Sequence, residues 1–186
     1  MPARAKPTTY AALLRGINLG SHKRVAMADL RELVEDLGCA DVRTYVQSGN
    51  VVLRSDLGAQ KLAQAIEKAI EKRLGHDITV VIRTERQLRD LVAANPFVRR
   101  KAREKTLYAT FLAEKPARER VRKLGERDFA PEQWEIVGDD ICLFFPNGYG
   151  RVKLNNAMFE RQLGVPATTR NWRTVTALAE LAADAG

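Results

Sequence analysis

The stretch "VRTYVQSGNVVLRS" (residues 42–55) decides the fold of this chain. It consists of two short runs rich in β-branched residues, which favour strands. Between the runs, Ser48 and Gly49 provide a turn, with glycine at the position that needs a positive φ angle. The stretch therefore predicts a β-hairpin, and the segments on either side of it predict the sheet that the hairpin joins.

Strands and helices alternate on both sides of this hairpin. Before it, "TTYAALLRG" (8–16) predicts a buried strand. A helix is then predicted by apolar residues at helical spacing, namely Leu30, Leu33, Val34 and Leu37. After the hairpin we expect a helix at 59–73 and a strand in "DITVVIRT" (77–84). The order β-α-β-β-α-β is typical of ferredoxin-like folds, in which two helices cover one face of an antiparallel sheet.

The second half of the chain nearly repeats this order. Thr84 and Gln87 form a capping-box pattern at the start of a connecting helix, which Asn95 and Pro96 end. Beyond it we expect a strand at 105–113, a helix at 116–124, strands at 132–137 and 140–146, and helices at about 152–163 and 171–183. The predicted order of this half is therefore β-α-β-β-α-α.

The near-repeat predicts an α+β protein made of two ferredoxin-like halves, with antiparallel sheets and helices on one face. The expected parts are a first βαββαβ half at 1–83, a connecting helix at 84–98 and a second βαββαα half at 99–186. Residue-by-residue similarity between the halves is negligible, so topology alone indicates the duplication. Because no long Gly/Ser linker separates them, the halves are expected to pack closely as one compact unit.

The 186-residue chain is basic, with a formal net charge of +8. The excess lies between Arg99 and Arg127, where eleven basic residues stand against four acidic ones. Such a segment favours acidic partners, such as nucleic acid, nucleotides or phosphorylated metabolites. A solvated, soluble helix and loop is the alternative explanation for the same charges.

Cysteine usage and hydropathy predict a cytoplasmic protein with no membrane association. Cys39 and Cys142 have no metal-binding spacing and define no disulfide framework, so both are expected to be buried and inert. No run approaches the roughly 18 apolar residues of a membrane span, and the first residues lack the apolar core of a signal peptide.

Three segments expected to precede helices combine basic side chains with glycine, threonine or asparagine: residues 15–24, 147–153 and 168–174. Backbone N–H groups at a helix start, together with the planar fork of arginine, form a cradle for phosphate or carboxylate oxygens. The third segment is unusual because Arg170 and Arg173 stand at a predicted helix start, where the dipole already makes the potential positive. We therefore expect a bound anion or an internal carboxylate beside them.

Each of these segments also has a local explanation, in which glycines serve turns, Thr and Asn cap helices, and arginines pair with internal acids. The turn at 47–50 is similarly ambiguous, since its amides would either read a base or sugar edge or simply close the hairpin. The candidate ligand-binding residues are Arg15, Asn18, Lys23, Gln47, Ser48, Asn50, Arg151, Lys153, Thr169, Arg170, Asn171 and Trp172.

Catalytic and metal-binding motifs are sparse. His22 and His76 have no partner at a recognisable spacing, and the glycine spacings match neither a P-loop nor a Rossmann site. The sequence therefore predicts no cofactor and no metal. Trp172 is the best-placed side chain for stacking on a base.

The chain resembles an uncharacterised, mostly bacterial family, domain of unknown function 1697. The motifs that carry the resemblance are "ALLRGINLG", "RVAMADLRELVEDLG", "VRTYVQSGNVVLRS", "LFFPNGYGRVKLNNAMFERQLGVPATTRNW" and "RTVTALAELA". It implies a duplicated α+β architecture and brings no established activity, cofactor or catalytic residue. The polar signature of the family falls on Arg15, Gly16, Asn18, Gln47, Ser48, Gly49, Asn50, Lys153, Thr169, Arg170, Asn171 and Trp172. The chain departs from the family at Val152, commonly Ser, and at Ala26, commonly Pro.

Three functions are compatible with the sequence. The favoured one is a binding module for a phosphate-bearing ligand, either nucleotide-like or nucleic acid. The second is an enzyme acting on a phosphorylated or acyl small molecule, with Lys153 or His22 as acid or base. The third is structural, with Arg170, Asn171 and Gln47 joining the two halves by hydrogen bonds. The sequence does not predict the oligomeric state.

Overall fold

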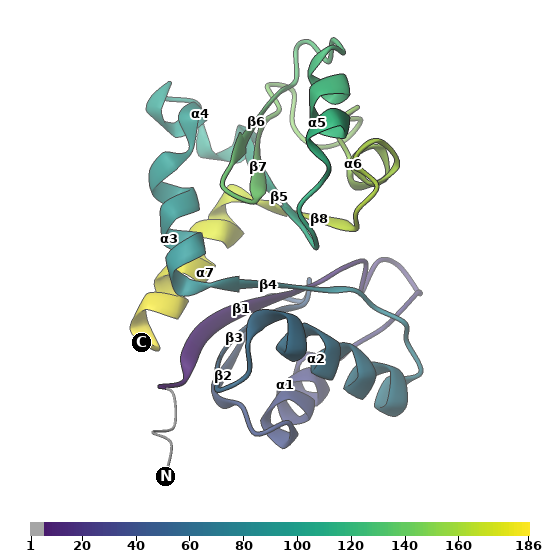
Figure 1. Ribbon diagram of the computed structural model, residues 1–186, viewed down its shortest axis with the longest axis vertical. Coiled ribbons are helices and arrows are strands. Elements are labelled where there is room, and N and C mark those ends of the chain that lie inside the picture. Colours follow the sequence, from purple (N-terminus) through teal and green to yellow (C-terminus); the bar gives the residue numbers. More distant parts are fainter. Residues whose placement is uncertain (1–5) are drawn as a thin grey trace. The chain divides into compact units, whose positions relative to one another are not determined.

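The computed structural model describes residues 6–186, in which the chain divides into two units (Figure 1). Unit 1 consists of the residues up to Leu88 together with Leu178–Gly186, and unit 2 is Arg89–Ala177. Each unit contains a four-stranded antiparallel sheet, with a pair of helices on one face. The predicted α+β architecture of two similar halves is confirmed.

Unit 1 is built around the predicted hairpin. Its elements are β1 Thr8–Leu14, α1 Met27–Asp36, β2 Ala40–Tyr45, β3 Asn50–Ser55, α2 Ala59–Leu74 and β4 Val80–Thr84. The strand order is β2-β3-β1-β4, and every neighbouring pair is antiparallel. Apolar side chains at helical spacing on α1 and α2 are buried against this sheet: Leu30, Leu33, Val34, Leu62, Ile66 and Ile70.

Unit 2 contains the second sheet, in the order β6-β7-β5-β8. The elements after β4 are α3 Glu85–Ala94, α4 Pro96–Arg99, a 3-10 turn at Glu104–Thr106, β5 Leu107–Leu112, α5 Arg118–Gly125, β6 Gln133–Val137, β7 Asp140–Phe144, α6 Asn156–Leu163, β8 Ala167–Asn171 and α7 Trp172–Asp184. Helices α5 and α6 cover one face of this sheet, where Phe145 and Phe159 are among the buried side chains (Figure 1).

The predicted capping box starts the connecting segment. The N–H of Gln87 donates to Thr84 Oγ1 at 3.1 Å, and the N–H of Thr84 donates to Gln87 Oε1 at 2.9 Å. The expected stop at Asn95-Pro96 ends α3 and also starts α4. Asn95 Oδ1 accepts from the N–H of Phe97 at 2.9 Å, and Pro96 occupies the first turn, where its missing N–H costs nothing.

The segment that was expected to open the last helix is instead a strand. Residues 167–171 pair with β5 as β8, so the second half also follows the order βαββαβ before its final helix. Arg170 therefore does not stand at a helix N-terminus. The β-branched Thr168 and Thr169 favour an extended backbone, and the ladder to β5 fixes it. Helix α7 starts one residue after Asn171, whose Oδ1 accepts from the N–H of Thr174 at 2.8 Å.

The helix expected from about Val152 also begins later, at Asn156. Asn155 is its cap, because its Oδ1 accepts from the N–H of Met158 at 3.0 Å. The preceding N–H groups, those of Lys153 and Leu154, donate to the two oxygens of the Glu132 carboxylate, each at 2.8 Å. These bonds hold the stretch as a loop.

In both sheets, the central strand and the edge strand pair the same types of residue. In each, a tyrosine of the central strand is paired with the last residue of the edge strand, and the alanine after it is paired with a buried arginine. The pairs are Tyr10–Thr84 and Ala11–Arg83 in unit 1, and Tyr108–Asn171 and Ala109–Arg170 in unit 2. The polar residue also caps the helix that follows. The duplication is therefore visible in individual residues once the strands are paired.

Candidate functional site

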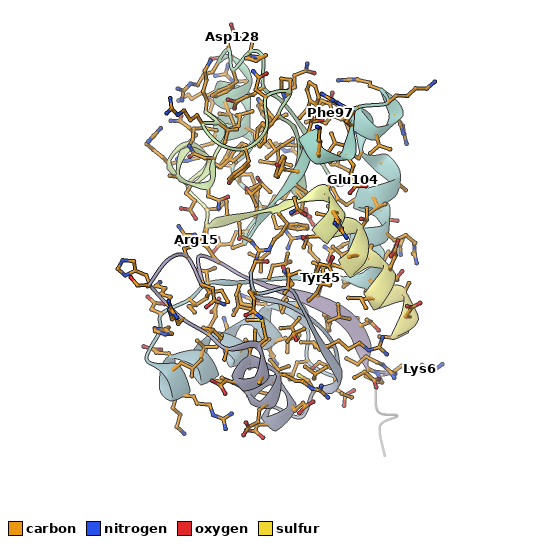
Figure 2. All side chains as sticks on the ribbon, turned by 180° about the vertical axis from the view of Figure 1, so that it is seen from behind. Lys6, Arg15, Tyr45, Phe97, Glu104 and Asp128 are labelled. Atoms are coloured by element: carbon orange, nitrogen blue, oxygen red, sulfur yellow. The ribbon has the colours of Figure 1, made fainter. Side chains whose placement is uncertain are left out.

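The predicted ligand-binding residues fall into two clusters, one in each unit. In unit 1, residues 15–25, which we call the Asn18 loop, lie beside the hairpin turn at 46–49. Arg15 marks the point where the chain leaves β1 (Figure 2). In unit 2, the loop 145–153 surrounds a cavity that we call the Arg151 cavity, and Thr169, Arg170 and Asn171 belong to β8.

Asn18 holds its loop closed and fastens it to the hairpin turn. Its Nδ2 donates to the carbonyl oxygens of Val25 and Gln47 at 2.9 and 2.7 Å, and its Oδ1 accepts from the N–H of Val25 at 2.9 Å. Its φ angle is 54°, a left-handed conformation that asparagine adopts more readily than most residues. The side-chain amide of Asn18 thus forms its hydrogen bonds within unit 1.

Lys23, Ser48 and Asn50 also have partners within unit 1. Lys23 Nζ donates to the carbonyl oxygen of Asp77 at 2.6 Å. Asn50 is fully buried, and its Nδ2 donates to the carbonyl oxygen of Tyr45 at 3.0 Å and to Ser48 Oγ at 2.9 Å. These contacts serve the local structure of the loop and the turn.

We expect Asn18→Ala to destabilise the protein by about 2 kcal/mol, because three hydrogen bonds, each with a net contribution of about 0.5–1.5 kcal/mol, are lost in a partly buried site. Asn18→Asp is the matched variant, since it keeps the acceptor for Val25 but removes both donated bonds. Urea unfolding of the three proteins measures the effect. Equal stability of Asn18→Ala and the wild type would contradict a fastening role.

In unit 2, the basic residue of β8 lies inside the fold. Arg170 is only 8% exposed, and its Nη1 donates to Thr168 Oγ1 at 2.7 Å and to the carbonyl oxygen of Thr169 at 3.2 Å. Burial lowers the pKa of the Arg170 guanidinium to about 10, and the nearby Tyr149 phenol acts in the opposite direction. Arg170 therefore stays charged at neutral pH. Trp172, expected to stack on a base, is 5% exposed and presents no open ring.

Hydroxyl groups gather around Thr169, the residue before this arginine. Thr169 Oγ1 lies 2.7 Å from Thr110 Oγ1 and donates to Asn156 Oδ1 at 2.6 Å. Burial raises the pKa of the Tyr149 phenol, whereas its hydrogen bond with Thr169 opposes that rise. The ring of Tyr149 remains 41% exposed and packs at 5.1 Å, centroid to centroid, from Tyr108. The sequence reasoning missed Tyr149, although a tyrosine between two glycines is a signal for an exposed ring.

The Arg151 cavity has a volume of about 550 Å³. Arg151, Lys153 and Glu132 line it together with Phe145, which is only 1% exposed, and the glycines of the loop. The Glu132 carboxylate is the internal anion of this loop, since both of its oxygens accept backbone N–H groups. Lys153 Nζ donates to the carbonyl oxygen of Ala130 at 3.2 Å, and Arg151 forms no hydrogen bond or ion pair with any residue that the structure describes.

The described part of the chain contains no candidate metal site and no helix that could span a membrane. Among residues 6–186, no group of three or more His, Cys, Asp and Glu side chains is arranged to hold a metal ion. None of the helices described combines the length and apolar character needed to cross a lipid bilayer. His22 is exposed, and His76 Nε2 lies 3.2 Å from the carbonyl oxygen of Arg24.

Comparison with known proteins agrees with the fold. The family described as protein of unknown function (DUF1697) matches residues 8–141. The chain belongs to this family. The DUF1697 match includes the Asn18 loop and the hairpin turn, and it confirms the resemblance found in the sequence motifs. It ends before the loop of the Arg151 cavity.

A solved structure of a conserved bacterial protein from Streptococcus pneumoniae is similar to this member of the DUF1697 family. The two chains are 21% identical, with a TM-score of 0.77, and the similarity covers 95% of this chain and 99% of that one. At this identity the comparison shows a shared fold. The search of curated proteins gives no match.

Proposed function

We propose that this protein is a binding module for a small phosphate-bearing, nucleotide-like ligand, and that the Arg151 cavity is its binding site. The observation that carries the proposal is the presence of two cations, Arg151 and Lys153, in one cavity whose loop also presents the partly exposed ring of Tyr149. Basic side chains hold phosphate oxygens, and an exposed aromatic ring beside them suits the flat face of a base. The volume of about 550 Å³ lies within the range of small-molecule sites.

The charges in the cavity favour an anion. The Glu132 carboxylate offsets one of the two cations, and its oxygens are already occupied by the N–H groups of Lys153 and Leu154. Arg151 keeps its whole guanidinium fork for a ligand, because it has no partner among the described residues. Gly148 and Gly150 leave the loop backbone without side chains, so a ligand can approach it closely.

The neighbouring rings support a nucleotide-like ligand rather than a bare phosphate. Tyr149 belongs to the same loop as the cations and is 41% exposed, and it packs on the buried ring of Phe145 with a centroid distance of 5.8 Å. Stacking of a base on an aromatic side chain contributes about 1–3 kcal/mol. A ligand with both a phosphate and a ring would therefore bind more tightly than phosphate alone.

We expect isothermal titration calorimetry to detect binding of AMP or ATP, with inorganic phosphate binding more weakly. Arg151→Gln should weaken nucleotide binding about tenfold or more, because a charge-assisted hydrogen bond contributes about 1.5–3 kcal/mol. Arg161→Gln on α6 is the matched control, since it removes one exposed positive charge outside the cavity. Equal affinities of the two variants, or no heat with any nucleotide, would refute the proposal.

A further inference from the structure

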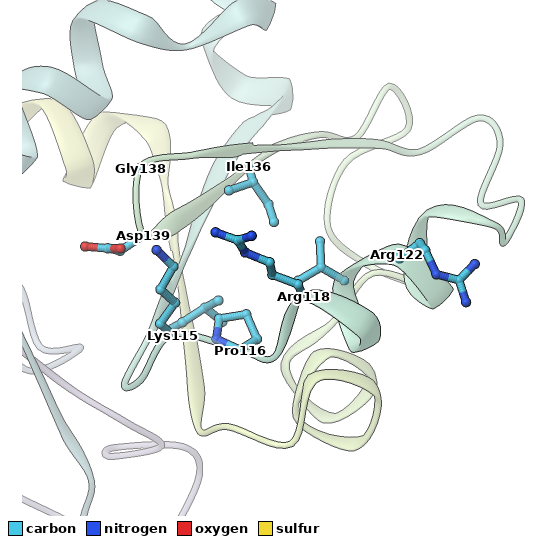
Figure 3. A pocket seen from close by; sticks show the side chains of 9 residues that line it. Lys115, Pro116, Arg118, Arg122, Ile136, Gly138 and Asp139 are labelled. Carbon is cyan, nitrogen blue, oxygen red and sulfur yellow. The ribbon is translucent and has the colours of Figure 1, made fainter.

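A second cavity in unit 2, which we call the α5 cavity, lies between the start of α5 and the edge strand β6 (Figure 3). Its volume is about 350 Å³, at the lower end of the range for small-molecule sites. Most of its wall is apolar and is formed by Leu112, Pro116, Val121 and Ile136. Ile136 is 41% exposed, so the cavity presents an apolar surface to the solvent.

Two cations stand at this apolar surface. Lys115 and Arg118 line the cavity, and Figure 3 shows the Arg118 guanidinium pointing into it beneath Ile136. Neither side chain forms a hydrogen bond or ion pair with another residue in the described part of the chain. Arg122 also lines the cavity, but in Figure 3 its guanidinium points away from it and is hydrogen-bonded to the carboxylates of Glu119 and Glu126.

The helix end adds to the positive potential. Arg118 is the first residue of α5, and the cap residue Ala117 supplies no side-chain hydrogen bond to the first turn. The N-terminal end of a helix is already positive, so a basic residue there is unfavourable unless an anion lies close by. Glu119 lies in the same turn, but its carboxylate is paired with Arg122. Asp139 also lines the cavity and contributes one negative charge. Because Lys115 and Arg118 contribute two positive charges, the charge around the apolar wall remains positive.

We propose that the α5 cavity binds a small carboxylate with an apolar body, such as a medium-chain fatty acid. The carboxylate lies between Lys115 and Arg118, and the apolar body packs against Ile136 and Val121. A neutral apolar molecule would leave the cations without a partner, and an inorganic anion would leave the apolar wall in water. The α5 cavity shares no lining residue with the Arg151 cavity, so this proposal does not depend on the proposed function.

Isothermal titration calorimetry with octanoate tests the proposal. Octan-1-ol has the same number of carbon atoms without the charge, and butyrate has the charge with four fewer methylene groups. Octanoate is expected to bind about tenfold or more tightly than either compound, because each lacks one of the two interactions. Octanoate that binds no better than octan-1-ol, or no better than butyrate, would overturn the proposal.

Variants then locate the site. Arg118→Gln should weaken octanoate binding about tenfold, whereas Lys123→Gln, on the same helix but outside the cavity, should leave it unchanged. Ile136→Ser should weaken octanoate binding and leave nucleotide binding at the Arg151 cavity unaltered. If Arg118→Gln fails to fold, Lys115→Gln, in the loop before α5, tests the same requirement for a positive charge. Equal octanoate affinity in the wild type, the Lys115 or Arg118 variant and Lys123→Gln would exclude this site.

Discussion

Replacing Gly49 with alanine is expected to destabilise the protein by about 2–5 kcal/mol. Gly49 closes the hairpin between β2 and β3 with a φ angle of 78°, a conformation that costs about 1–2 kcal/mol for a residue with a Cβ. A Cβ at this position would lie 2.5 Å from Ile17 Cδ1 and 2.9 Å from Leu14 Cβ. Because both neighbours are buried, relieving this overlap adds about 1–3 kcal/mol.

Gly38→Ala separates the two contributions. Gly38 has a φ angle of 81°, but no atom lies within 4 Å of the position that its Cβ would take. This variant should therefore lose only the conformational part, about 1–2 kcal/mol. Urea unfolding of both variants at one temperature measures the difference. If both variants lose the same free energy of unfolding, then Ile17 moves aside at no cost and the packing argument is wrong.

The close approach at Gly49 and the bonds of Asn18 have a common consequence for the candidate site. Gly49 packs on Ile17, and Asn18 binds the carbonyl oxygen of Gln47, so the loop and the turn are joined through adjacent residues. Asn18, Ser48 and Asn50 are therefore needed for the local fold whether or not a ligand binds nearby. At the Arg151 cavity, by contrast, Arg151 has no partner among the described residues and is available to a ligand.

The parts of the fold that could be predicted from the sequence are those with local signals. The turn at Ser48-Gly49 and the helical spacing on α1 and α2 each depend on residues close in the chain. By contrast, Ala167–Asn171 is a strand because β5 pairs with it, and β5 lies more than fifty residues earlier. The late start of α6 likewise depends on Glu132, which is 21 residues away from Lys153. A local sequence pattern does not indicate partners that lie so far away in the chain.

At the candidate site, too, the sequence predicted what depends on local residues and not what depends on distant contacts. The sequence identified Arg151 and Lys153 by their charge beside glycines, and the structure places both on one cavity. It did not indicate Glu132, because a single glutamate before a strand has no distinguishing pattern. It identified Asn18 and Gln47 as polar candidates, but their bond joins residues 29 positions apart and uses the backbone of Gln47. These distant contacts decide which polar groups already form hydrogen bonds inside the fold.

Cysteine 142 is expected to make the wild-type protein less stable than its Cys142→Ala variant above about pH 10. Cys142 is fully buried in β7, and burial, with Asp140 and Glu135 nearby, raises the pKa of its thiol from 9 to about 12. The unfolded chain ionises this thiol near pH 9. The folded state therefore loses about 1.4 kcal/mol of stability per pH unit as the pH rises from 9 towards 12, about 4 kcal/mol in total.

The alanine variant has no thiol to ionise, but at pH 7 it is expected to be about 1 kcal/mol less stable because it leaves a small cavity. The two stability curves should therefore cross as the pH rises, which urea unfolding between pH 7 and 11 measures. Cys39→Ala is the control. Burial also raises the pKa of Cys39, but a hydrogen bond from Ser55 opposes the rise, so its pH-dependent difference should be smaller. Parallel curves for the wild type and Cys142→Ala would show that the folded protein accommodates the Cys142 thiolate.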